Sequence, residues 1–278
     1  MLVSTPIGNL SDLSPRAASC LAGADLILCE DTRNTAHLLN AWGITAKLEA
    51  VHEHNERRRL AHVLDLLREG RRIALVSDAG TPLLSDPGFP LVRAAIAEGL
   101  PVTAIPGPNA AVMALTLSGL PPHPFLFLGF APSRDGARRS AFGGLRAAEQ
   151  AGLRATLIWH EAPHRLAEML AELAAVFGAK REAAVARELT KRFEEVVRGP
   201  VGELAERFAT HPARGEITVL LGPVPEEQAS SDELDSRLLE ALRDHSVKDA
   251  ASLVSAATAL PRRLVYGRAM ELARRQED

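Results

Sequence analysis

The fold is decided by one stretch of the chain, Ile73-Ala74-Leu75-Val76-Ser77-Asp78-Ala79-Gly80-Thr81-Pro82-Leu83-Leu84-Ser85-Asp86-Pro87-Gly88. Its first four residues are the apolar run of a buried strand, and apolar residues at helical spacing follow over 91–96. The connection Ser77–Gly88 holds two Asp, two Pro and two Gly, and strand-to-helix connections usually need only about 2–6 residues. Ligands of open α/β sheets bind beyond the carboxyl ends of the strands. This connection is therefore predicted to form a ligand site.

Composition limits the class of protein. The 278 residues are 46% hydrophobic and 24% charged, with 4% aromatic, which is typical of a water-soluble globular chain with an aliphatic core. No apolar run approaches the length of a membrane span, and the first residues do not resemble a secretory signal. Cys20 and Cys29 are too few for a disulfide framework. We expect reduced thiols, no membrane partner and a cytoplasmic location.

Charge alone does not identify a partner. The formal net charge is −3, which does not indicate a nucleic-acid-binding protein, although a local basic patch can still bind one. The basic clusters are Arg57-Arg58-Arg59, Arg138-Arg139, Lys191-Arg192, Arg262-Arg263 and Arg274-Arg275. We interpret most of them as solvated helix faces.

Strand and helix patterns alternate along the chain. Strands are expected at 1–3, 26–29, 73–76, 102–105, 125–130, 156–159, 183–186 and 216–221. Helices are expected at 14–22, 56–69, 91–98, 110–117, 138–151, 164–176, 232–243, 248–257 and 262–274. Ser14 and Asn55 are candidate N-caps. This alternation predicts α/β architecture with mostly parallel sheets and helices on their faces.

Two clusters of Pro and Gly predict the domain boundaries. The first is Ser118–Pro124, and the second is Gly222–Pro225, after which the sequence becomes polar and helical. We therefore predict an N-terminal α/β domain at 1–118, a C-terminal α/β domain at 119–224 and a helical tail at 225–278.

Several nucleotide and metal motifs are missing from the sequence. There is no G-x-G-x-x-G after the first strand and no G-x-x-x-x-G-K-[ST], so the phosphate cradles of dehydrogenases and P-loop enzymes are absent. No zinc spacing or G-x-S-x-G elbow occurs either, and no metal is expected. The remaining strand-end loops carry Pro, Gly, Asp and Asn, as in Glu30-Asp31-Thr32-Arg33. They suit an uncharged or zwitterionic ligand with a ribose, and S-adenosylmethionine matches that description.

A set of motifs in these loops resembles the ribosomal RNA small-subunit methyltransferase I family of the tetrapyrrole methylase superfamily. The matching segments run in family order along nearly the whole chain: Thr5–Leu10, Glu30–Arg33, His52–Glu56, Ser77–Gly88, Pro106–Pro108, Gly129-Phe130, Glu161–Leu166, Arg187–Lys191 and Gly215–Thr218. Two departures are His160, where the family usually carries Tyr, and a first strand unusually close to Met1.

The resemblance implies a fold and an activity. The fold would be two α/β domains of the tetrapyrrole methylase type, with a cofactor cleft between them and a small helical tail. The enzyme would be a cytosolic homodimer that transfers a methyl group from S-adenosylmethionine to a ribose 2′-hydroxyl. The acceptor would be one cytidine in the decoding region of 16S ribosomal RNA, with the small ribosomal subunit as partner. Two rival functions stay open: a tetrapyrrole (porphyrinogen or precorrin) methyltransferase and a non-catalytic RNA-binding assembly factor.

Site residues follow from their positions in the matched motifs. The expected cofactor-binding residues are Pro6, Asp78, Ala79, Gly80, Ser85, Pro106, Gly107, Pro108, Ala110 and Thr218. The candidate catalytic residues, as base or as nearby cation, are Glu188, Lys191, Glu30 and Asp31. The candidate RNA-binding residues are Arg33, Arg165, Arg187 and Arg192, with Lys191 beside them.

Structural roles compete with these assignments. Asp78 and Asp86 are also suited to capping the loop backbone, and a salt bridge such as Arg187 with Glu188 would leave neither side chain for catalysis. His52 and His54 could contact substrate or only stabilise their loop. Two interpretations of the tail stay open: an RNA-contacting module, or a packed tail that stabilises a dimer. The residues that suggest RNA contact are Lys248, Arg262, Arg263, Tyr266 and Arg268.

Overall fold

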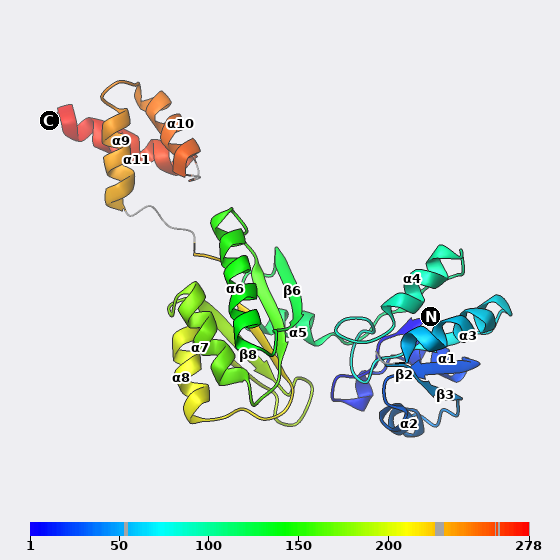
Figure 1. The fold of residues 1–278 in the computed structure, drawn as a ribbon. Coiled ribbons are helices and arrows are strands. Elements are labelled where there is room, and N and C mark those ends of the chain that lie inside the picture. The colour runs from blue at the N-terminus through cyan, green and yellow to red at the C-terminus, as the bar shows by residue number, and fades with distance from the viewer. Residues whose placement is uncertain (53–54, 226–230, 259, 261, 278) are drawn as a thin grey trace. The chain divides into compact units, whose positions relative to one another are not determined.

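The computed structural model of the chain describes residues 1–52, 55–225, 231–258, 260 and 262–277. It divides into two compact units, 1–224 and 225–278. The first unit contains two five-stranded sheets, one formed by strands up to residue 105 and one by strands from residue 125 onward (Figure 1).

The first sheet is parallel throughout, as the alternation of strands and helices predicts. It contains β1 (Leu2–Val3), β2 (Leu26–Cys29), β3 (Leu48–Ala50), β4 (Ile73–Leu75) and β5 (Ala104–Ile105) in the order β3-β2-β4-β1-β5. All four residues of β2 are buried, as expected for a central strand covered on both faces. Because every strand runs the same way, the loops after β1, β2, β4 and β5 emerge at one edge of the sheet.

The helices of this half are η1 (Leu10–Asp12), α1 (Pro15–Ala22), α2 (Thr32–Ala41), α3 (Glu56–Arg68) and α4 (Phe89–Ala97). The Ser14 cap is confirmed, because its hydroxyl accepts a hydrogen bond from the Ala17 amide at 3.1 Å. Asn55 does lie at the N-cap position of α3, but its side chain makes no capping hydrogen bond. The Asn55 side chain instead accepts from the His52 amide at 3.0 Å and donates to the Ala50 carbonyl at 3.1 Å, so it stabilises the preceding loop.

The second sheet is mixed, so the expectation of mostly parallel strands is wrong for it. Its strands are β6 (Phe125–Phe130), β7 (Thr156–Glu161), β8 (Glu182–Arg187), β9 (Glu195–Pro200) and β10 (Ile217–Leu221) in the order β6-β7-β10-β8-β9. Only the β6–β7 pair is parallel within this sheet. The cause is β9, which the sequence analysis missed: it pairs antiparallel with β8 and returns the chain before α8.

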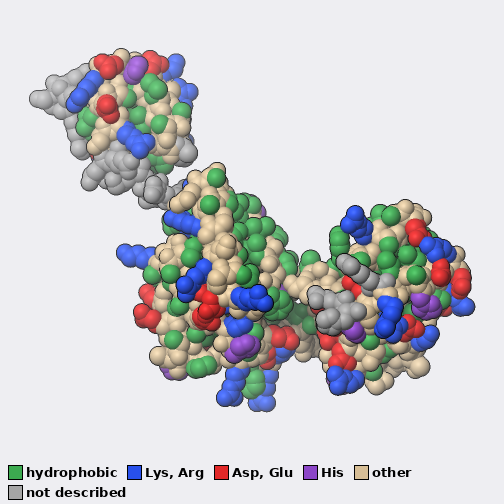
Figure 2. All heavy atoms as spheres, in the orientation of Figure 1, with side chains coloured by type: hydrophobic (Ala, Val, Ile, Leu, Met, Phe, Trp, Pro, Cys, Tyr) green, Lys and Arg blue, Asp and Glu red, His purple; other side chains and the backbone are tan. Residues whose placement is uncertain are grey.

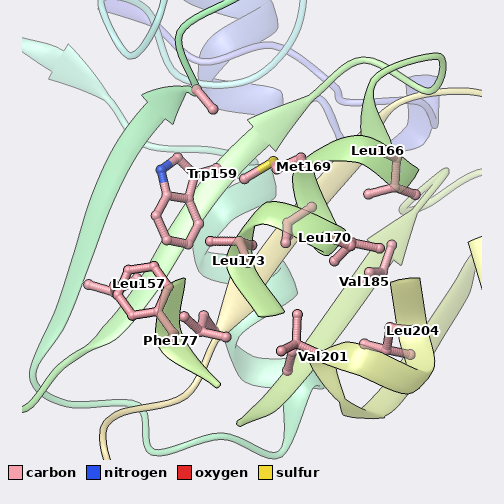
Figure 3. Close-up of a cluster of buried hydrophobic side chains, with 14 of the residues drawn as sticks. Leu157, Trp159, Leu166, Met169, Leu170, Leu173, Phe177, Val185, Val201 and Leu204 are labelled. Carbon is pink, nitrogen blue, oxygen red and sulfur yellow. The ribbon is translucent and has the colours of Figure 1, made fainter. Parts of the chain in front are cut away.

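The core of this half lies between the sheet and three helices, α6 (Asp135–Gln150), α7 (Leu166–Phe177) and α8 (Val201–Thr210). In Figure 3 the side chains of α7, including Leu170 and Leu173, point toward Leu157 and Trp159 of β7. Trp159 also meets Phe142 of α6 edge-on, with ring centroids 5.7 Å apart. Dense aliphatic and aromatic packing of this kind makes the second sheet a rigid wall for the site.

Helix α5 (Ala110–Ser118) precedes the first Pro-rich cluster but packs against the second sheet. Its buried residues Ala111, Ala114 and Leu115 contact Ile158 and Ala184 of that sheet, among others. Asn109 caps its start by accepting from the Val112 amide at 3.0 Å. The β5–α5 loop is therefore fixed against both halves of the unit.

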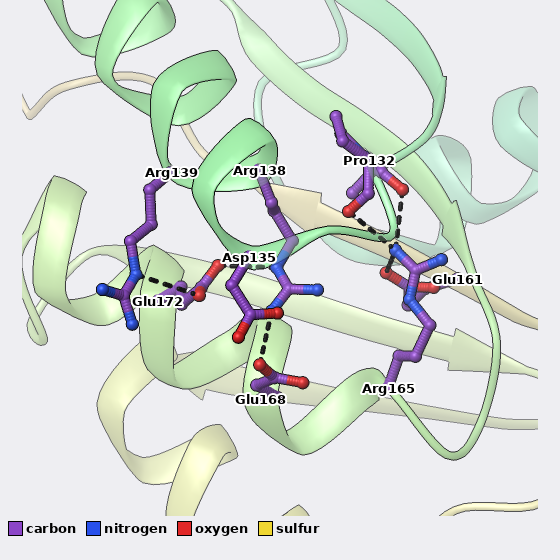
Figure 4. A network of polar contacts seen from close by, with 9 residues as sticks. Pro132, Asp135, Arg138, Arg139, Glu161, Arg165, Glu168 and Glu172 are labelled. Carbon is purple, nitrogen blue, oxygen red and sulfur yellow. Dashed lines mark hydrogen bonds and ion pairs between the residues drawn. The ribbon is translucent and has the colours of Figure 1, made fainter.

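Charged side chains are spread over the first unit. On the face drawn in Figure 2, acidic and basic groups are interspersed over the first unit. Arg138 does not lie on a solvated helix face. It is 1% exposed and lies 2.6 Å from Glu172 Oε2 and 2.7 Å from Glu168 Oε1 (Figure 4). For Arg138 the interpretation as a solvated face is wrong, because three acidic residues, Asp135 included, surround the guanidinium.

The second unit is a small helical domain. Its helices are α9 (Ser231–Ala241), α10 (Val247–Thr258) and α11 (Arg262–Glu277), packed around Leu238, Val254 and Val265. Arg268 donates two hydrogen bonds to Asp235, at 2.7 and 2.6 Å, and so joins α11 to α9.

Candidate functional site

A cavity of about 350 Å³ in the first unit is lined by residues of both sheets. From the first half come Ile7, Asp78, Ala79, Gly80, Thr81, Leu84, Ser85, Asp86, Asn109 and Ala110. From the second come Phe127, Phe130, His160, Glu161, Ala162, Pro163, Ala186, Leu189, Gly215, Glu216, Ile217 and Thr218. The volume lies within the range of small-molecule and cofactor sites.

The β4–α4 loop, residues 76–88, forms one wall and is fixed to the β1 loop. Thr5 and Gly80 exchange two backbone hydrogen bonds, at 2.9 and 3.1 Å. Gly80 has φ +83°, a conformation that disfavours other residues, and a Cβ there would lie 3.2 Å from Ile7. Thr81 Oγ1 donates to the Pro108 carbonyl at 3.1 Å. Three strand-end loops are thereby locked together.

Two further residues of this loop, Leu83 and Ser85, have positive φ without being glycine, at 72° and 70°. Such conformations cost about 1 kcal/mol or more each and persist only where surrounding contacts impose them. Leu83 packs against the hydrophobic cluster beneath β4, whereas Ser85 and Asp86 line the cavity. The strain therefore serves to turn these two polar residues toward the site.

The cavity wall is acidic. Asp78, Asp86, Glu161 and Glu216 line it, and within the described part of the chain no Lys or Arg does. Burial, together with the charges of Glu30 and Asp78, raises the pKa of Asp86 to about 6. Burial likewise raises the pKa of Glu161. A ligand carrying positive charge would lower the energy of these crowded carboxylates.

The opposite wall is apolar and aromatic. His160 lies between Phe127 and Phe130, with ring centroids 5.0 and 5.7 Å away. Its Nδ1 lies 3.2 Å from Thr218 Oγ1, and burial lowers the pKa of His160, so the ring is neutral at pH 7. His160 therefore belongs to an uncharged aromatic surface, with its ring inclined by about 60° to both phenylalanines, that suits a heteroaromatic ring.

The residues predicted to bind cofactor divide into two groups. Six line the cavity: Asp78, Ala79, Gly80, Ser85, Ala110 and Thr218. The other four, Pro6, Pro106, Gly107 and Pro108, lie behind it in the supporting loops. A Cβ on Gly107 would come within 2.9 Å of Ser4 Cβ, which shows how closely the β5 and β1 loops pack.

Asp78 has a structural role as well as a place in the wall. Its Oδ1 accepts from the Asp31 amide at 3.0 Å, and its Oδ2 accepts from Asn34 Nδ2 at 2.8 Å. The carboxylate thus connects the loop after β4 to the start of α2. Asp31 itself caps α2 through a 2.8 Å hydrogen bond from the Arg33 amide.

Of the four candidate catalytic residues, Glu188 and Lys191 form one cluster beside the cavity. Lys191 Nζ lies 2.9 Å from Glu188 Oε1 and 3.1 Å from Glu216 Oε2. Burial alone would lower the pKa of Lys191, but its hydrogen bonds to the two carboxylates raise it above the ordinary value. The hydrogen bond from Lys191 correspondingly lowers the pKa of Glu188. Lys191 is thus a fixed cation and Glu188 a poor base.

This lysine lies directly over the first loop. A Cβ on Gly8 would lie 2.4 Å from Lys191 Cγ, closer than any real contact, so Gly8 leaves the space that the lysine fills. The other two candidates lie elsewhere. Glu30 is exposed after β2, and the side-chain hydrogen bond from Arg33 lowers the pKa of Asp31 to about 2. Asp31 is therefore a cap and ion-pair partner, not a base.

The predicted RNA-binding arginines are largely engaged within the chain. Arg33 lies 2.6 Å from Asp31 Oδ2, and Arg187 Nε lies 2.6 Å from Glu195 Oε2. Arg165 donates to the Ala131 carbonyl at 2.7 Å and lies 3.1 Å from Glu161 (Figure 4). The alternative of a structural salt bridge holds for both Arg187 and Glu188, but with other partners than each other: Arg187 pairs with Glu195, and Glu188 pairs with Lys191.

Arg192 differs from these three. Its guanidinium lies over the ring of its neighbour Phe193, 5.6 Å from the centroid, and Phe193 is 63% exposed. Neither side chain lines the cavity. Of the two histidines, His52 is partly buried beside Asn55, and His54 lies outside the described residues.

Among the cavity-lining residues that were not predicted to bind the cofactor are the apolar Phe127 and Phe130, and the acidic Asp86. Phe127 and Phe130 belong to an uninterrupted apolar strand, and nothing local distinguishes a cavity-facing Phe from a core Phe. The one signal that could have identified them is that β6 is an edge strand, where side chains stay more exposed than in a central strand. No group of three or more His, Cys, Asp or Glu residues within the described ranges could hold a metal ion. No helix among those described is long and apolar enough to cross a membrane.

The site suits S-adenosylmethionine. Its backbone-rich loops offer hydrogen bonds, its aromatic wall offers a surface for adenine, and its carboxylates favour a sulfonium cation. A phosphate-bearing dinucleotide would find no described lysine or arginine in the wall.

Comparisons with known proteins agree with this fold and site. The family model for tetrapyrrole (corrin/porphyrin) methylases matches residues 1–205, and the model described as the RsmI C-terminal HTH domain matches 228–273. Among solved structures, uroporphyrin-III C-methyltransferase from Thermus thermophilus covers 79% of this chain and 92% of its own, with TM-score 0.53 and 22% identity. Diphthine synthase covers 79% and 90%, with TM-score 0.57 and 14% identity. The chain therefore has the fold of a tetrapyrrole methylase.

Curated relatives narrow the assignment. Ribosomal RNA small subunit methyltransferase I of Xylella fastidiosa is 44% identical over 269 residues, covering 96% of this chain and 97% of the relative. The protein of the same name from Escherichia coli O157:H7 is 40% identical over 275 residues, covering 97% and 94%. The chain belongs to the ribosomal RNA small subunit methyltransferase I family.

Proposed function

We propose that the protein uses S-adenosylmethionine to methylate small-subunit ribosomal RNA, at the ribose 2′-hydroxyl of one cytidine in the decoding region. The observation that carries the cofactor assignment is the cavity lining, which combines carboxylates from both halves of the unit with an aromatic surface from the second half. The names of the curated relatives support ribosomal RNA as the substrate. We further propose that it acts in the cytoplasm.

Within the cavity, the residues of the chain would bind the cofactor and orient its methyl group. The ten cofactor-binding residues of the sequence analysis would hold the cofactor, six as lining and four through the supporting loops. S-adenosylmethionine, when bound, supplies a methyl group on a positively charged sulfur. Thr218 and His160 would fix an adenine edge and face, and the carboxylate of Asp78 would accept from ribose hydroxyls. Preorganised loops of this kind lower the entropic cost of aligning the methyl group with the attacking hydroxyl.

The acceptor hydroxyl needs help, because a ribose hydroxyl is a weak nucleophile. Lys191 is a cation fixed by Glu188 and Glu216 at the rim, and it would stabilise negative charge developing on that oxygen. Asp86 is a lining carboxylate whose pKa is raised to about 6, which brings its proton affinity closer to that of an effective general base at neutral pH. We assign it the role of accepting the hydroxyl proton, with Glu30 nearby.

Substrate and partner surfaces extend this proposal. Arg192 and Phe193 offer a cation beside an exposed aromatic ring, a combination suited to RNA. Arg33, Arg165 and Arg187 would position the loops around the RNA. Homodimer formation is supported by edge strand β6, where Phe125 and Leu126, neither of which lines the cavity, are 44% and 38% exposed.

The test uses small ribosomal subunits from cells that lack this methylation, incubated with the protein and labelled S-adenosylmethionine. Nuclease digestion and mass spectrometry should locate one new 2′-O-methylated cytidine in the decoding region. Transfer to a porphyrinogen but not to subunits would instead establish a tetrapyrrole methyltransferase. Failure to bind the cofactor in calorimetry would point to a non-catalytic assembly factor.

A pair of lysine variants tests the rim cation. Lys191→Met should lower kcat by about 100-fold, the typical effect of removing one group that stabilises developing negative charge. Cofactor affinity should change little, because Lys191 does not line the cavity. Lys180→Met, at an exposed position on the same domain, should retain full activity. Equal activity in both variants would refute the role of Lys191.

A further inference from the structure

An open groove of about 430 Å³ lies on the helical tail, lined by Lys248, Arg262, Arg263 and Tyr266. Lys248 is the second residue of α10, and the two arginines begin α11. Tyr266 follows one turn later on α11, so it shares a helix face with both arginines. We name this set of four residues the tail groove.

The tail groove concentrates positive charge in an otherwise acidic unit. In residues 225–278, acidic residues outnumber basic ones by 11 to 8. Among the described residues that line the groove there is no carboxylate. Asp249, next to Lys248, is turned toward its own helix cap and hydrogen-bonds Ser246 Oγ at 2.6 Å. The positive ends of α10 and α11 add to the field here.

Arg268 does not belong to this surface, contrary to its grouping with the other tail residues in the sequence analysis. It donates to Asp235 and Glu271 and serves to join helices. The three groove cations, in contrast, are exposed at the helix starts. Their charge is therefore available to a ligand, whereas that of Arg268 is used in packing.

The fourth member of the groove is aromatic. Tyr266 is the chain's only tyrosine and is 42% exposed. Phosphate-binding cations around an exposed ring form the combination that binds single-stranded nucleic acid, because bases stack on the ring while the cations contact phosphates. A duplex would offer its backbone to the cations but no free base to the ring.

We propose that the tail groove binds a single-stranded segment of RNA, with phosphates on Lys248, Arg262 and Arg263 and one base stacked on Tyr266. That the RNA is ribosomal rests on the proposed function; the binding mode does not. The groove would thus give the enzyme a second RNA contact, separate from its cofactor cavity.

The test measures binding of the full-length protein to a fluorescently labelled 12-nucleotide single-stranded RNA of mixed sequence. Arg263→Ala should reduce the slope of log affinity against log salt by about 0.7, the value for one lost phosphate contact on a single strand. Arg274→Ala is the matched control: it removes the same charge from α11, about 17 Å further along the helix. The control should leave affinity and slope unchanged.

The stacking contact has its own pair of variants. Tyr266→Ala should weaken binding by at least about fivefold, because the base loses its stacking partner. Tyr266→Phe should retain most of the affinity, since the ring remains. Ultraviolet cross-linking followed by mass spectrometry should place a nucleotide on the peptide that contains Tyr266.

The outcomes separate this proposal from the proposed function. Unchanged RNA affinity in Arg263→Ala and Tyr266→Ala would overturn the groove, even if the protein methylates ribosomal RNA. Unchanged RNA affinity with weakened binding to intact subunits would also overturn it and indicate a protein contact. Groove-dependent RNA binding without cofactor binding would support the groove and refute the proposed function.

Discussion

Asp86→Asn is the substitution whose effects the structure defines most sharply. In the folded protein, burial and the charges of Glu30 and Asp78 raise the pKa of Asp86 from 3.8 to about 6. Between these values the folded state keeps a proton that the unfolded state has lost, so stability falls as pH rises through this window. The pKa difference corresponds to about 3 kcal/mol, which solvent screening of this partly exposed side chain reduces to about 1–2 kcal/mol.

The unliganded Asp86→Asn protein should therefore be more stable than the parent by about 1–2 kcal/mol at pH 7.5. The difference should shrink steadily as pH falls toward 4.5. Urea unfolding measures it, and Trp42 fluorescence in a Trp159→Phe background reports on the domain that holds Asp86. Asp12→Asn, at an exposed position of the same domain, is the control and should show no such pH dependence.

Activity should change in the opposite direction. The same Asp86→Asn protein should lose methyl transfer and bind the cationic cofactor more weakly, because an amide neither accepts the proton nor balances positive charge. A stability difference between variant and parent that stays the same at pH 4.5 and pH 7.5, or a variant less stable than the parent at pH 7.5, would refute the electrostatic reasoning. Full activity with the expected stability gain would refute only the catalytic role.

Three further predictions concern packing. Gly107→Ala should greatly weaken cofactor binding in calorimetry, because its Cβ would lie 2.9 Å from that of Ser4 and separate two supporting loops. Glu149→Gln should destabilise the second domain by about 3–5 kcal/mol in urea unfolding, since it leaves the buried Arg181 guanidinium, now 2.8 Å from Glu149 Oε2, without a charge partner. Adding Arg181→Met should restore much of the loss. Burial raises the pKa of the Cys29 thiol, so Cys29 should react with Ellman's reagent only after unfolding.

Sequence predicted those parts of the fold whose signals are local. Ser14 with Pro15 fixed the start of a helix, and the Pro, Gly and Asp residues of the β4 loop indicated the site. Strand β9 was not predicted, because it lies at the edge of its sheet and ends in Gly199-Pro200, a pair typical of loops. Helix α8 did carry a signal, since Val201, Leu204 and Phe208 recur at helical spacing and are buried.

The site was harder to predict because it depends on partners that are distant in sequence. Lys191 and Glu188 are close in the chain, but their location over Gly8 and beside Glu216 requires both sheets. Position in a matched motif also made Arg33 a candidate for RNA binding, although its acidic partner Asp31 is two residues away. Whether a charge faces outward is decided by tertiary pairing, which composition does not contain.

The left-handed residue Leu83 connects the interior of the first domain to its ligand loop. Its side chain belongs to the hydrophobic cluster that contains Leu75 and Leu91, while Ser85 lies two residues further on at the cavity. A substitution deep in that cluster can therefore alter ligand affinity without touching the ligand. The coupling is reciprocal: the free energy by which the packing of the cluster favours ligand binding equals the free energy by which a bound ligand favours that packing. Ligand-dependent protection of β4 amides from hydrogen exchange would be the visible sign of this coupling.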